Sequence, residues 1–257
     1  MLDPARFLRP IAHRGLHDPR AGLVENTLPA FAAAVAQGYG IECDLQPAAE
    51  GLPIVFHDAT TDRLLDRPGR TRDLGYRDIL GLRHRHGVGH LPTFAQMLEA
   101  VGGRVPVLAE IKSDWGAPDF GFLRQICQAA KGHEPGLAVM SFDPAVVEVM
   151  ADLAPDLPRG LVSGALSLHA PTVAAIGRER AIRIEGLEDA GRLAADFVAF
   201  DVRALPSPRV LEVRAAGLLA FAWTVTTDAE LACAERWADA PIFEGLRPKV
   251  ESRTGSV

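Results

Sequence analysis

The stretch that decides the fold runs from residue 41 to residue 58 and reads Ile-Glu-Cys-Asp-Leu-Gln-Pro-Ala-Ala-Glu-Gly-Leu-Pro-Ile-Val-Phe-His-Asp. It contains two apolar runs typical of strands, Ile41–Leu45 and Ile54–His57. Only about seven residues separate Leu45 from Pro53, whereas a crossover between parallel strands needs roughly a dozen or more. We therefore predict an antiparallel hairpin that turns near Glu50 and Gly51 and brings Asp44 opposite His57.

Outside this hairpin, short apolar runs alternate with helical patterns along the whole chain. Such alternation is typical of a parallel sheet whose strands are joined by helices. With the second hairpin strand set aside, eight strands remain, which is the number in a (β/α)8 TIM barrel. The strands outside the hairpin are predicted at Ile11–His13, Val107–Ile111, Leu137–Ser141, Arg159–Val162, Phe197–Asp201, Leu219–Thr224 and Ile242–Glu244. The elements between residues 163 and 196 are ambiguous.

Several helices have recognisable start signals in the sequence. Ser, Thr, Asp and Asn cap helix N-termini, Pro favours the first turn, and Glu or Gln three residues after the cap completes a capping box. These signals predict helix starts at Asn26 or Thr27 before Pro29, at Thr93 with Gln96, at Asp143-Pro144, at Ser207-Pro208, and at Thr227 with Glu230, the last opening a helix through Trp237.

Composition excludes several protein classes. The chain has 257 residues, of which 48% are hydrophobic and 23% charged, which excludes a disordered or collagen-like chain. The net charge of −6 argues against nucleic-acid binding through a broad basic face. No apolar run reaches the ~18 residues that a membrane helix needs, and the stretch Met1–Pro10 has no signal-peptide core, so a cytoplasmic protein is expected.

The same composition bounds domain organisation and cysteine chemistry. No linker, charge block or repeat divides the sequence, so we expect one domain over residues 1–257. Cys43, Cys127 and Cys233 are too few and too scattered for a disulfide framework or a zinc ribbon. We expect them to be buried small hydrophobic residues.

Three carboxylates are predicted at the carboxyl ends of strands, the end of a barrel that carries active sites. The two-residue period of a strand puts Glu42 and Asp44 on one face, with Cys43 on the other. Glu110 ends the apolar run that starts at Val107. Taken alone, the first pair could be a solvated strand edge or an ion pair. Three converging carboxylates instead require a divalent cation, and all-oxygen ligation suits Mg²⁺ or Ca²⁺.

Cations and histidines are predicted at the same mouth. Lys112 shares the strand face of Glu110, and Arg14 precedes a glycine where the chain can turn closely. Each could be an ordinary surface charge, but beside a metal they would suit a phosphate group. His13 and His57 are the candidate proton-transfer pair. Cleavage of a phosphodiester needs a base for the nucleophile, an acid for the leaving alkoxide and positive charge on the phosphate.

Taken together, these motifs resemble the glycerophosphodiester phosphodiesterases, TIM-barrel enzymes related to phosphatidylinositol-specific phospholipase C. The matching motifs, in order, are His13-Arg14-Gly15, Glu25-Asn26-Thr27, Ile41-Glu42-Cys43-Asp44, His57-Asp58 followed by Asp62-Arg63, and Glu110-Ile111-Lys112, with weaker echoes at Ser141-Phe142 and Trp223-Thr224-Val225. The resemblance implies a divalent metal on Glu42, Asp44 and Glu110, His13 and His57 as the acid and base, and Arg14 and Lys112 on the phosphate.

The resemblance also implies roles beyond these residues. Phe142 and Trp223 would line the glycerol or leaving-group side of the pocket, although they could equally be core aromatics. Glu25-Asn26-Thr27 would support the first loop, and an insertion within residues 59–103 would cover the mouth. The family often has a Thr-Asp-x-Pro pattern near the C-terminus. Here Glu244 stands in Ile242-Phe243-Glu244-Gly245-Leu246-Arg247-Pro248, which leaves open whether it takes over a polar role.

The sequence thus predicts hydrolysis of small glycerophosphodiesters to glycerol 3-phosphate and an alcohol. A lysophospholipase D-like enzyme that acts on lysophospholipids, and a non-catalytic barrel that binds phosphodiesters, are the alternatives. The histidine cluster His84, His86 and His90 is read as a solvated loop rather than a second metal site. The sequence leaves open the alcohol, the choice of Mg²⁺ or Ca²⁺, the acid and base assignment, water or cyclic-phosphate route, and the oligomeric state.

Overall fold

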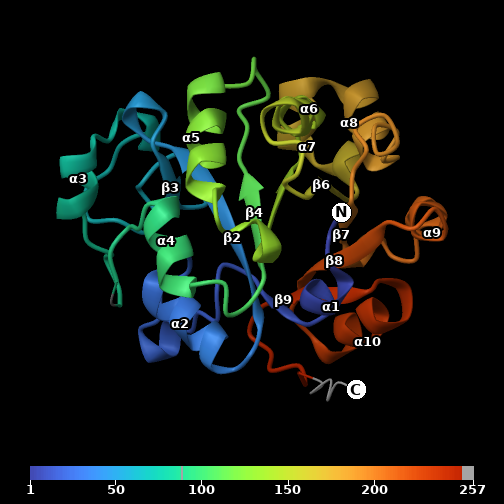
Figure 1. Cartoon of the computed structure of the whole chain (residues 1–257), viewed down its shortest axis with the longest axis horizontal. Helices are drawn as coiled ribbons and strands as arrows, with labels where there is room; N and C mark the ends of the chain where they lie inside the picture. The colour runs from blue at the N-terminus through green and yellow to red at the C-terminus, as the bar shows by residue number, and fades with distance from the viewer. Residues whose placement is uncertain (88, 251–257) are drawn as a thin grey trace.

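A closed barrel of eight parallel strands forms the centre of the computed structural model, which describes residues 1–87 and 89–250 (Figure 1). The strands run in the order β1-β9-β8-β7-β6-β5-β4-β2, and β1 also pairs with β2, which closes the ring. This confirms the predicted TIM barrel. The strands are β1 (Ile11–Ala12), β2 (Gly40–Pro47), β3 (Pro53–Val55), β4 (Val107–Ile111), β5 (Leu137–Ser141), β6 (Arg159–Ser163), β7 (Phe197–Asp201), β8 (Leu219–Val225) and β9 (Ala240–Phe243).

The ninth strand, β3, is the antiparallel partner of β2, as the short spacing predicts. Its register pairs Leu45 with Val55 and Pro47 with Pro53. The predicted pairing of Asp44 with His57 is wrong by one residue, since the Phe56 N–H donates to the Asp44 carbonyl at 2.9 Å. The reason is the turn: it is centred on Glu50, which adopts a left-handed φ of 59°, within the 3₁₀ turn Ala49–Gly51.

Three strands, β1, β3 and β9, end earlier than the sequence pattern indicates. His13, His57 and Glu244 each lie one or two residues beyond the ends of β1, β3 and β9. Backbone pairing continues only partly there, through the His13 N–H on the Phe243 carbonyl at 2.9 Å. These side chains therefore sit on the rim of the barrel, where the chain leaves the sheet for a loop.

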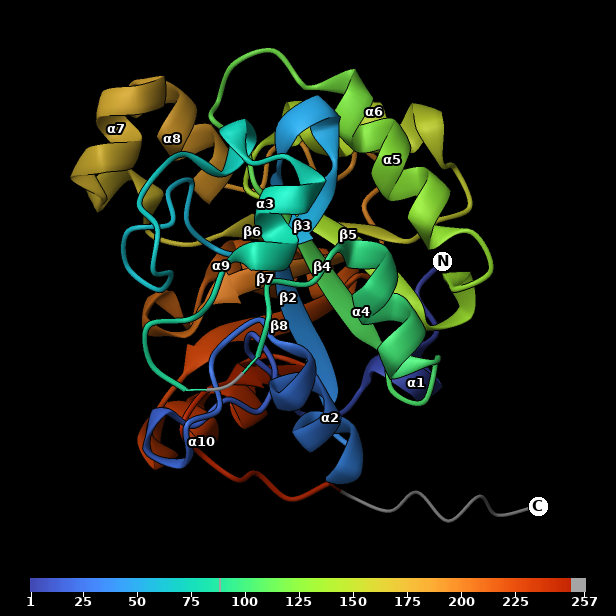
Figure 2. The same cartoon turned by 90° about the vertical axis from the view of Figure 1, so that its left-hand side faces the viewer.

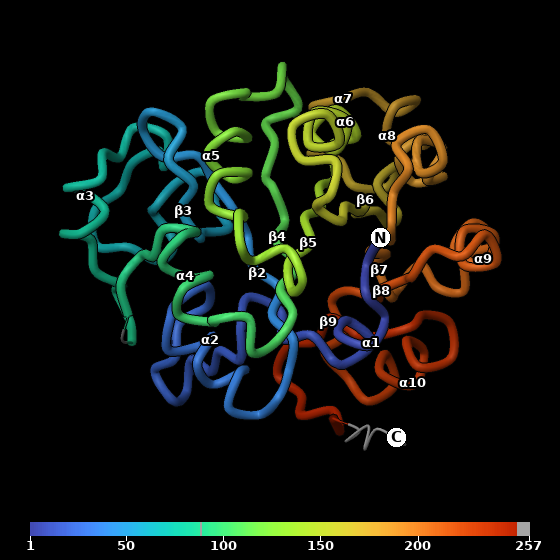
Figure 3. Tube along the Cα trace, in the orientation of Figure 1, coloured from blue at the N-terminus to red at the C-terminus, as the bar shows by residue number. Residues whose placement is uncertain are grey.

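Helices surround the barrel, as the trace in Figure 3 follows. They are α1 (Pro4–Phe7), α2 (Leu28–Ala36), α3 (Tyr76–Gly81), α4 (Phe94–Val101), α5 (Phe120–Ala130), α6 (Pro144–Leu153), α7 (Ala170–Ile176), α8 (Arg178–Glu185), α9 (Pro208–Ala215) and α10 (Asp228–Trp237). Within the described residues, we find no helix with the length and apolarity that crossing a bilayer requires.

The predicted helix starts are confirmed, and the structure decides between the two candidates for α2. Thr93 with Gln96 and Thr227 with Glu230 form capping boxes, and Asp143 and Ser207 cap α6 and α9. At the start of α2 the cap position is Thr27, not Asn26. Asn26 instead adopts a left-handed φ of 56° and turns its amide toward the barrel.

Two apolar layers fix which side chains point into the barrel. Strand alternation sends Leu108 into the interior and Ala109 to the helix-facing layer, so that Glu110 points inward again. Cys43 lies in the outer layer, as expected for a buried small residue, while Cys127 and Cys233 are half-buried; all three are free thiols. The interior layer consists of Leu2, Phe7, Ile11, Leu108, Ala138, Met140, Val162, Phe197, Ala199, Phe221, Ala240 and Ile242.

Two segments beside the barrel extend this plan. The chain between β3 and α4 has its own apolar cluster, which includes Phe56, Leu65 and Ile79, and α3 lies on this side of the molecule (Figure 2). The expected insertion range of 59–103 includes α4, which packs between α2 and α5 on the outer ring. The ambiguous stretch after β6 forms α7 and α8, which share a small apolar cluster with Trp115 and Phe142.

Candidate functional site

Three carboxylates meet at the carboxyl ends of β2 and β4. Asp44 is in register with Glu110 on the neighbouring strand, and Glu42 lies one inward position earlier on β2. One carboxylate oxygen from each of the three can be chosen so that all lie within 4.8 Å of one another. All three side chains are buried. The arrangement could hold a metal ion, because hard divalent cations bind clustered carboxylate oxygens.

The charges in this cluster are unequally balanced. Burial, together with the nearby Asp44 and Glu110 carboxylates, raises the pKa of Glu42 well above its usual value. Burial also acts on Asp44, but the cations Lys112 and Arg14 outweigh it and lower the pKa of that carboxyl below its usual range. Like charges packed out of water are costly without a counter-charge. The cluster therefore favours additional positive charge.

Two cations from the protein already face the carboxylates. Lys112 Nζ lies 2.7 Å from Asp44 Oδ1 and 2.5 Å from Glu110 Oε1. Although burial opposes it, these two carboxylates raise the pKa of Lys112, so the ammonium remains charged. Arg14, at a left-handed φ of 54°, donates its backbone N–H to Glu42 at 2.9 Å and brings Nε to 3.2 Å from Asp44.

Asn26 is a site residue that the sequence reasoning treated as a helix cap. Its Nδ2 donates to Asp44 Oδ2 at 2.8 Å, and its Oδ1 accepts from the Asp44 backbone N–H at 3.3 Å. Asn tolerates the left-handed backbone that this position requires better than most residues. The sequence signal for this role is the Glu25-Asn26-Thr27 motif. Because Thr27 occupies the N-cap position of α2, Asn26 is not needed as a cap.

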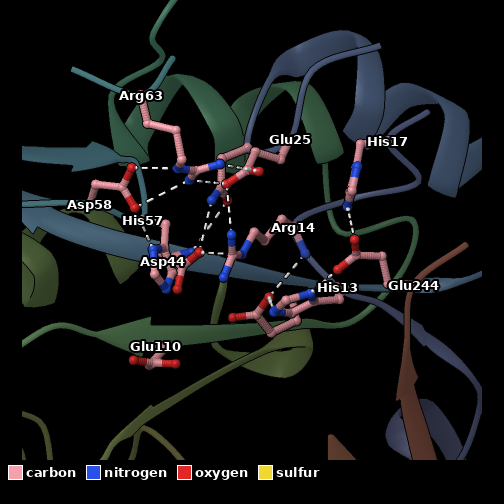
Figure 4. A network of polar contacts seen from close by, with 12 residues as sticks. His13, Arg14, His17, Glu25, Asp44, His57, Asp58, Arg63, Glu110 and Glu244 are labelled. Carbon is pink, nitrogen blue, oxygen red and sulfur yellow. Dashed lines mark hydrogen bonds and ion pairs between the residues drawn. The ribbon is translucent and has the colours of Figure 1, made fainter. Parts of the chain in front are cut away.

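His13 lies at the barrel mouth between two carboxylates. Its Nδ1 is 2.9 Å from Glu244 Oε2, and its Nε2 is 3.9 Å from Glu42 Oε2. Burial lowers the pKa of His13, against the effect of Glu244. Glu244 thus takes a polar role at the end of the last strand. Its other oxygen lies 3.7 Å from Nε2 of His17, a residue that sequence reasoning missed (Figure 4).

His57 lies on the other side of the carboxylates and is more exposed. Its Nδ1 is 2.7 Å from Asp58 Oδ1, the carboxylate of the next residue. Burial opposes ionisation of Asp58, but hydrogen bonds from Arg63 and His57 lower its pKa. Figure 4 shows His57 and His13 flanking Asp44. The structure therefore brings both predicted histidines to the same mouth as the acids.

The two predicted aromatic residues pack against each other. Phe142 directly follows β5 and Trp223 lies on β8, and their rings meet edge to face with centroids 5.4 Å apart. The Trp223 indole N–H donates to the Ser163 carbonyl at 3.2 Å, which fixes the ring. Both side chains are partly buried against the interior apolar layer. They are therefore neither fully buried core residues nor fully exposed ones.

The histidines at residues 84, 86 and 90 lie in the segment between α3 and α4. His86 and His90 are exposed, and His84 is half-buried. Among the described residues, the group of Glu42, Asp44 and Glu110 is the metal-compatible cluster that we find. Nothing in the described part of the chain therefore supports a second metal site.

Comparisons of the sequence with known proteins find glycerophosphodiester phosphodiesterases among its relatives. Bovine glycerophosphodiester phosphodiesterase 1 is 42% identical over 81 residues, which are 31% of this chain and 23% of that protein. A glycerophosphodiester phosphodiesterase of Bacillus subtilis is 26% identical over 265 aligned positions, 95% of this chain and 85% of that one. The alignment with the mammalian relatives thus spans less than a quarter of their length.

Solved structures match over most of the barrel. A phosphodiesterase of Oleispira antarctica, in complex with sn-glycerol-3-phosphate, superposes with a TM-score of 0.71 at 21% identity, over 91% of this chain and 92% of that one. A glycerophosphodiester phosphodiesterase of Thermotoga maritima gives 0.69 at 20% identity with the same coverage. These likenesses establish the shared fold. The sequence model of the glycerophosphoryl diester phosphodiesterase family matches residues 13–243, so this chain belongs to that family.

Proposed function

We propose that this protein hydrolyses small glycerophosphodiesters to sn-glycerol 3-phosphate and an alcohol, with a divalent cation, Mg²⁺ or Ca²⁺, as cofactor. The observation that supports this most directly is the convergence of Glu42, Asp44 and Glu110. One carboxylate oxygen from each lies within 4.8 Å of the other two, and the cluster lies between two imidazoles. Family membership over residues 13–243 supports the same reaction class.

The donor set fits a hard divalent cation. Three buried carboxylates supply oxygen ligands only, which suits Mg²⁺ or Ca²⁺ better than Zn²⁺. The raised pKa of Glu42 reflects, after burial, repulsion from the other two carboxylates, which a bound cation would relieve. When bound there, the cation would supply charge neutralisation and Lewis-acid polarisation of the phosphate.

The protein's own cations would bind the phosphate beside it. Lys112 and Arg14 are held at the triad through Asp44, at 2.7 and 3.2 Å. A planar guanidinium and a compact ammonium are the groups that proteins use to bind phosphate oxygens. Their positive charge would be most valuable in the transition state, when negative charge grows on the non-bridging oxygens.

His13 and His57 would transfer the protons. One takes the proton of the nucleophile, and the other protonates the alkoxide oxygen as its bond to phosphorus breaks. The nucleophile would be water or the glycerol 2-hydroxyl, the latter through a cyclic phosphate. Each ring has a carboxylate on Nδ1, which fixes the tautomer that leaves Nε2 free for the substrate.

Phe142 and Trp223 would line the glycerol side of the pocket. Their edge-to-face pair offers an apolar surface to the substrate. A lysophospholipid substrate would in addition need an apolar groove beside the triad. The apolar cavity of ≈ 570 Å³ between α3 and α4 is lined by Leu28, Ile79, Leu80 and Leu91 and by no triad residue. This cavity therefore does not supply such a groove.

The test is an assay of choline release from glycerophosphocholine, which leaves glycerol 3-phosphate, and from lysophosphatidylcholine, which leaves lysophosphatidic acid. We expect turnover of the first after addition of Mg²⁺ or Ca²⁺ to chelated protein, and little turnover of the second. Titration calorimetry with Mg²⁺ and Ca²⁺ gives an independent readout, in which Glu42→Gln should weaken binding and the remote Glu134→Gln should not. Tight binding of glycerophosphocholine without turnover, with metal present, would instead identify a non-catalytic binding protein.

A further inference from the structure

Arg63 makes two bidentate contacts at the edge of the site. Its guanidinium donates to both oxygens of Asp58, at 2.7 and 3.2 Å, and to both oxygens of Glu25, at 2.9 and 2.8 Å. Figure 4 shows that Asp58 contacts His57 and that Glu25 contacts Arg14. Resting on the proposed function, we propose that Arg63 is a positioning residue that orients His57 through Asp58 and Arg14 through Glu25.

The first branch leads to the proton-transfer residue. Asp58 Oδ1 accepts from Arg63 and also lies 2.7 Å from His57 Nδ1. Because Arg63 holds both oxygens of Asp58, the carboxylate cannot rotate away from the ring. The branch therefore sets the tautomer and direction of His57, a role like that of the carboxylates behind metal-bound histidines.

The second branch leads to the phosphate-binding residue. Glu25 Oε1 accepts from Arg63 Nη2 and from Arg14 Nη1, the latter at 2.7 Å. Arg14 in turn approaches Asp44 at 3.2 Å. Two residues, Glu25 and Arg14, thus lie between Arg63 and the triad, and each of the charged groups is paired. Loss of Arg63 leaves Glu25 with a single partner and Arg14 less firmly held.

The segment between β3 and α4 supplies a rigid base for Arg63. Leu65 is fully buried in the apolar cluster of that segment, and its N–H donates to the Thr61 carbonyl at 2.9 Å. Arg63 lies between these two residues, so its backbone is fixed while its side chain reaches Asp58 and the first loop. The segment therefore contributes to the site through the geometry of this one side chain.

A lysine could not replace these contacts. A planar guanidinium matches two carboxylates at once, whereas an ammonium is a point charge without a fork. Arg63→Lys should therefore keep the charge but lose most of the orientation. Arg192 offers a matched control, because it also bridges two carboxylates, Glu148 and Asp189, with a comparable exposure of its side chain, but lies outside the site.

The experiment compares the steady-state kinetics of Arg63→Met, Arg63→Lys and Arg192→Met on glycerophosphocholine. We expect Arg63→Met to lower kcat/KM about 10- to 100-fold, with both a lower kcat and a higher KM. Arg63→Lys should be intermediate, and Arg192→Met should match the wild type. Circular dichroism and thermal unfolding check folding, and Arg63→Lys keeps the test available if the Met variant does not fold.

Second substitutions separate the two branches. Asp58→Asn should lower mainly kcat, and Glu25→Gln should raise mainly KM. Adding Arg63→Met to either should cost less than the product of the two losses, because coupled residues are not additive. Wild-type kinetics for Arg63→Met, or fully multiplicative losses in both double variants, would overturn the inference alone. Absence of turnover by the wild type with metal would overturn the proposed function and, with it, this inference.

Discussion

The two histidines of the site are held in contrasting ways. The His13 side chain is 15% exposed, and its carboxylate partner Glu244 comes from the opposite end of the sequence, 231 residues away. His57 is 35% exposed, and its partner Asp58 is the next residue. Glu244 lies between two histidines, whereas Asp58 is held by the Arg63 guanidinium.

This difference separates two sources of rigidity. The His13 side depends on barrel closure, because Glu244 follows β9 and His13 follows β1, which pair with each other. The His57 side depends on a hydrogen-bonded network anchored outside the barrel, in the segment that carries Arg63. Changes to the barrel should therefore affect His13 first, and changes to the network should affect His57 first.

Removal of the metal should have the largest effect, because the acidic triad lies between both histidines. Treatment with EDTA is expected to lower kcat by a factor on the order of 10³ or more, since metal stabilisation of the phosphate contributes several kcal/mol. Activity assays before and after re-addition of Mg²⁺ or Ca²⁺ measure this. Full activity of the chelated protein would mean that the two histidines, each with its carboxylate partner, act without a cation.

Loss of either imidazole should come next. His13→Gln and His57→Gln are each expected to lower kcat by about 10²–10⁴, the range for a general acid or base. His86→Gln, at an exposed position of the segment before α4, serves as the control. If one of the two variants retains near-wild-type turnover, the corresponding histidine has no proton-transfer role. Only the other histidine would then remain a candidate general acid or base.

Sequence patterns could predict the parts of the molecule that follow from local periodicity. The two-residue period put Glu42 and Asp44 on the inward face, and the short spacing between two apolar runs predicted the hairpin. The caps at Thr93, Asp143 and Thr227 were readable because they depend on residues only one to three positions apart. Local rules thus identified the barrel and the acidic triad.

The supporting contacts could not be predicted in the same way. The bond between His13 and Glu244 joins residues at opposite ends of the chain, and only barrel closure brings them together. The predicted hairpin register was wrong by one residue. The turn is centred on Glu50, and no feature of the sequence indicates that this residue adopts a left-handed conformation. The role of Arg63 depends on the path of an irregular segment, which has no periodicity to read.

Substitution of the two supporting carboxylates should sharpen the contrast. Asp58→Asn introduces an amide NH₂ facing the Arg63 donors, so we expect kcat to fall about 10- to 100-fold. In Glu244→Gln the amide oxygen can still accept from His13, while the NH₂ can face the unpartnered Nε2 of His17. A loss of about 10-fold or less is expected there. Steady-state kinetics of both variants compare them, and a larger loss in Glu244→Gln would contradict the proposed difference.

The smallest effects should come from the helix caps that border the two sides. Thr227 caps α10, which leads into β9 and Glu244, and Thr93 caps α4, which follows the segment that carries Arg63. Thr227→Ala and Thr93→Ala should each lower the free energy of unfolding by about 1 kcal/mol, the usual cost of losing such a cap. Denaturant unfolding measures this cost, and kcat should stay within about twofold of wild type because neither cap touches the site. If Thr227→Ala lowers kcat by much more than Thr93→Ala does, then the His13 side depends on the α10–β9 connection as well as on the strand pairing itself.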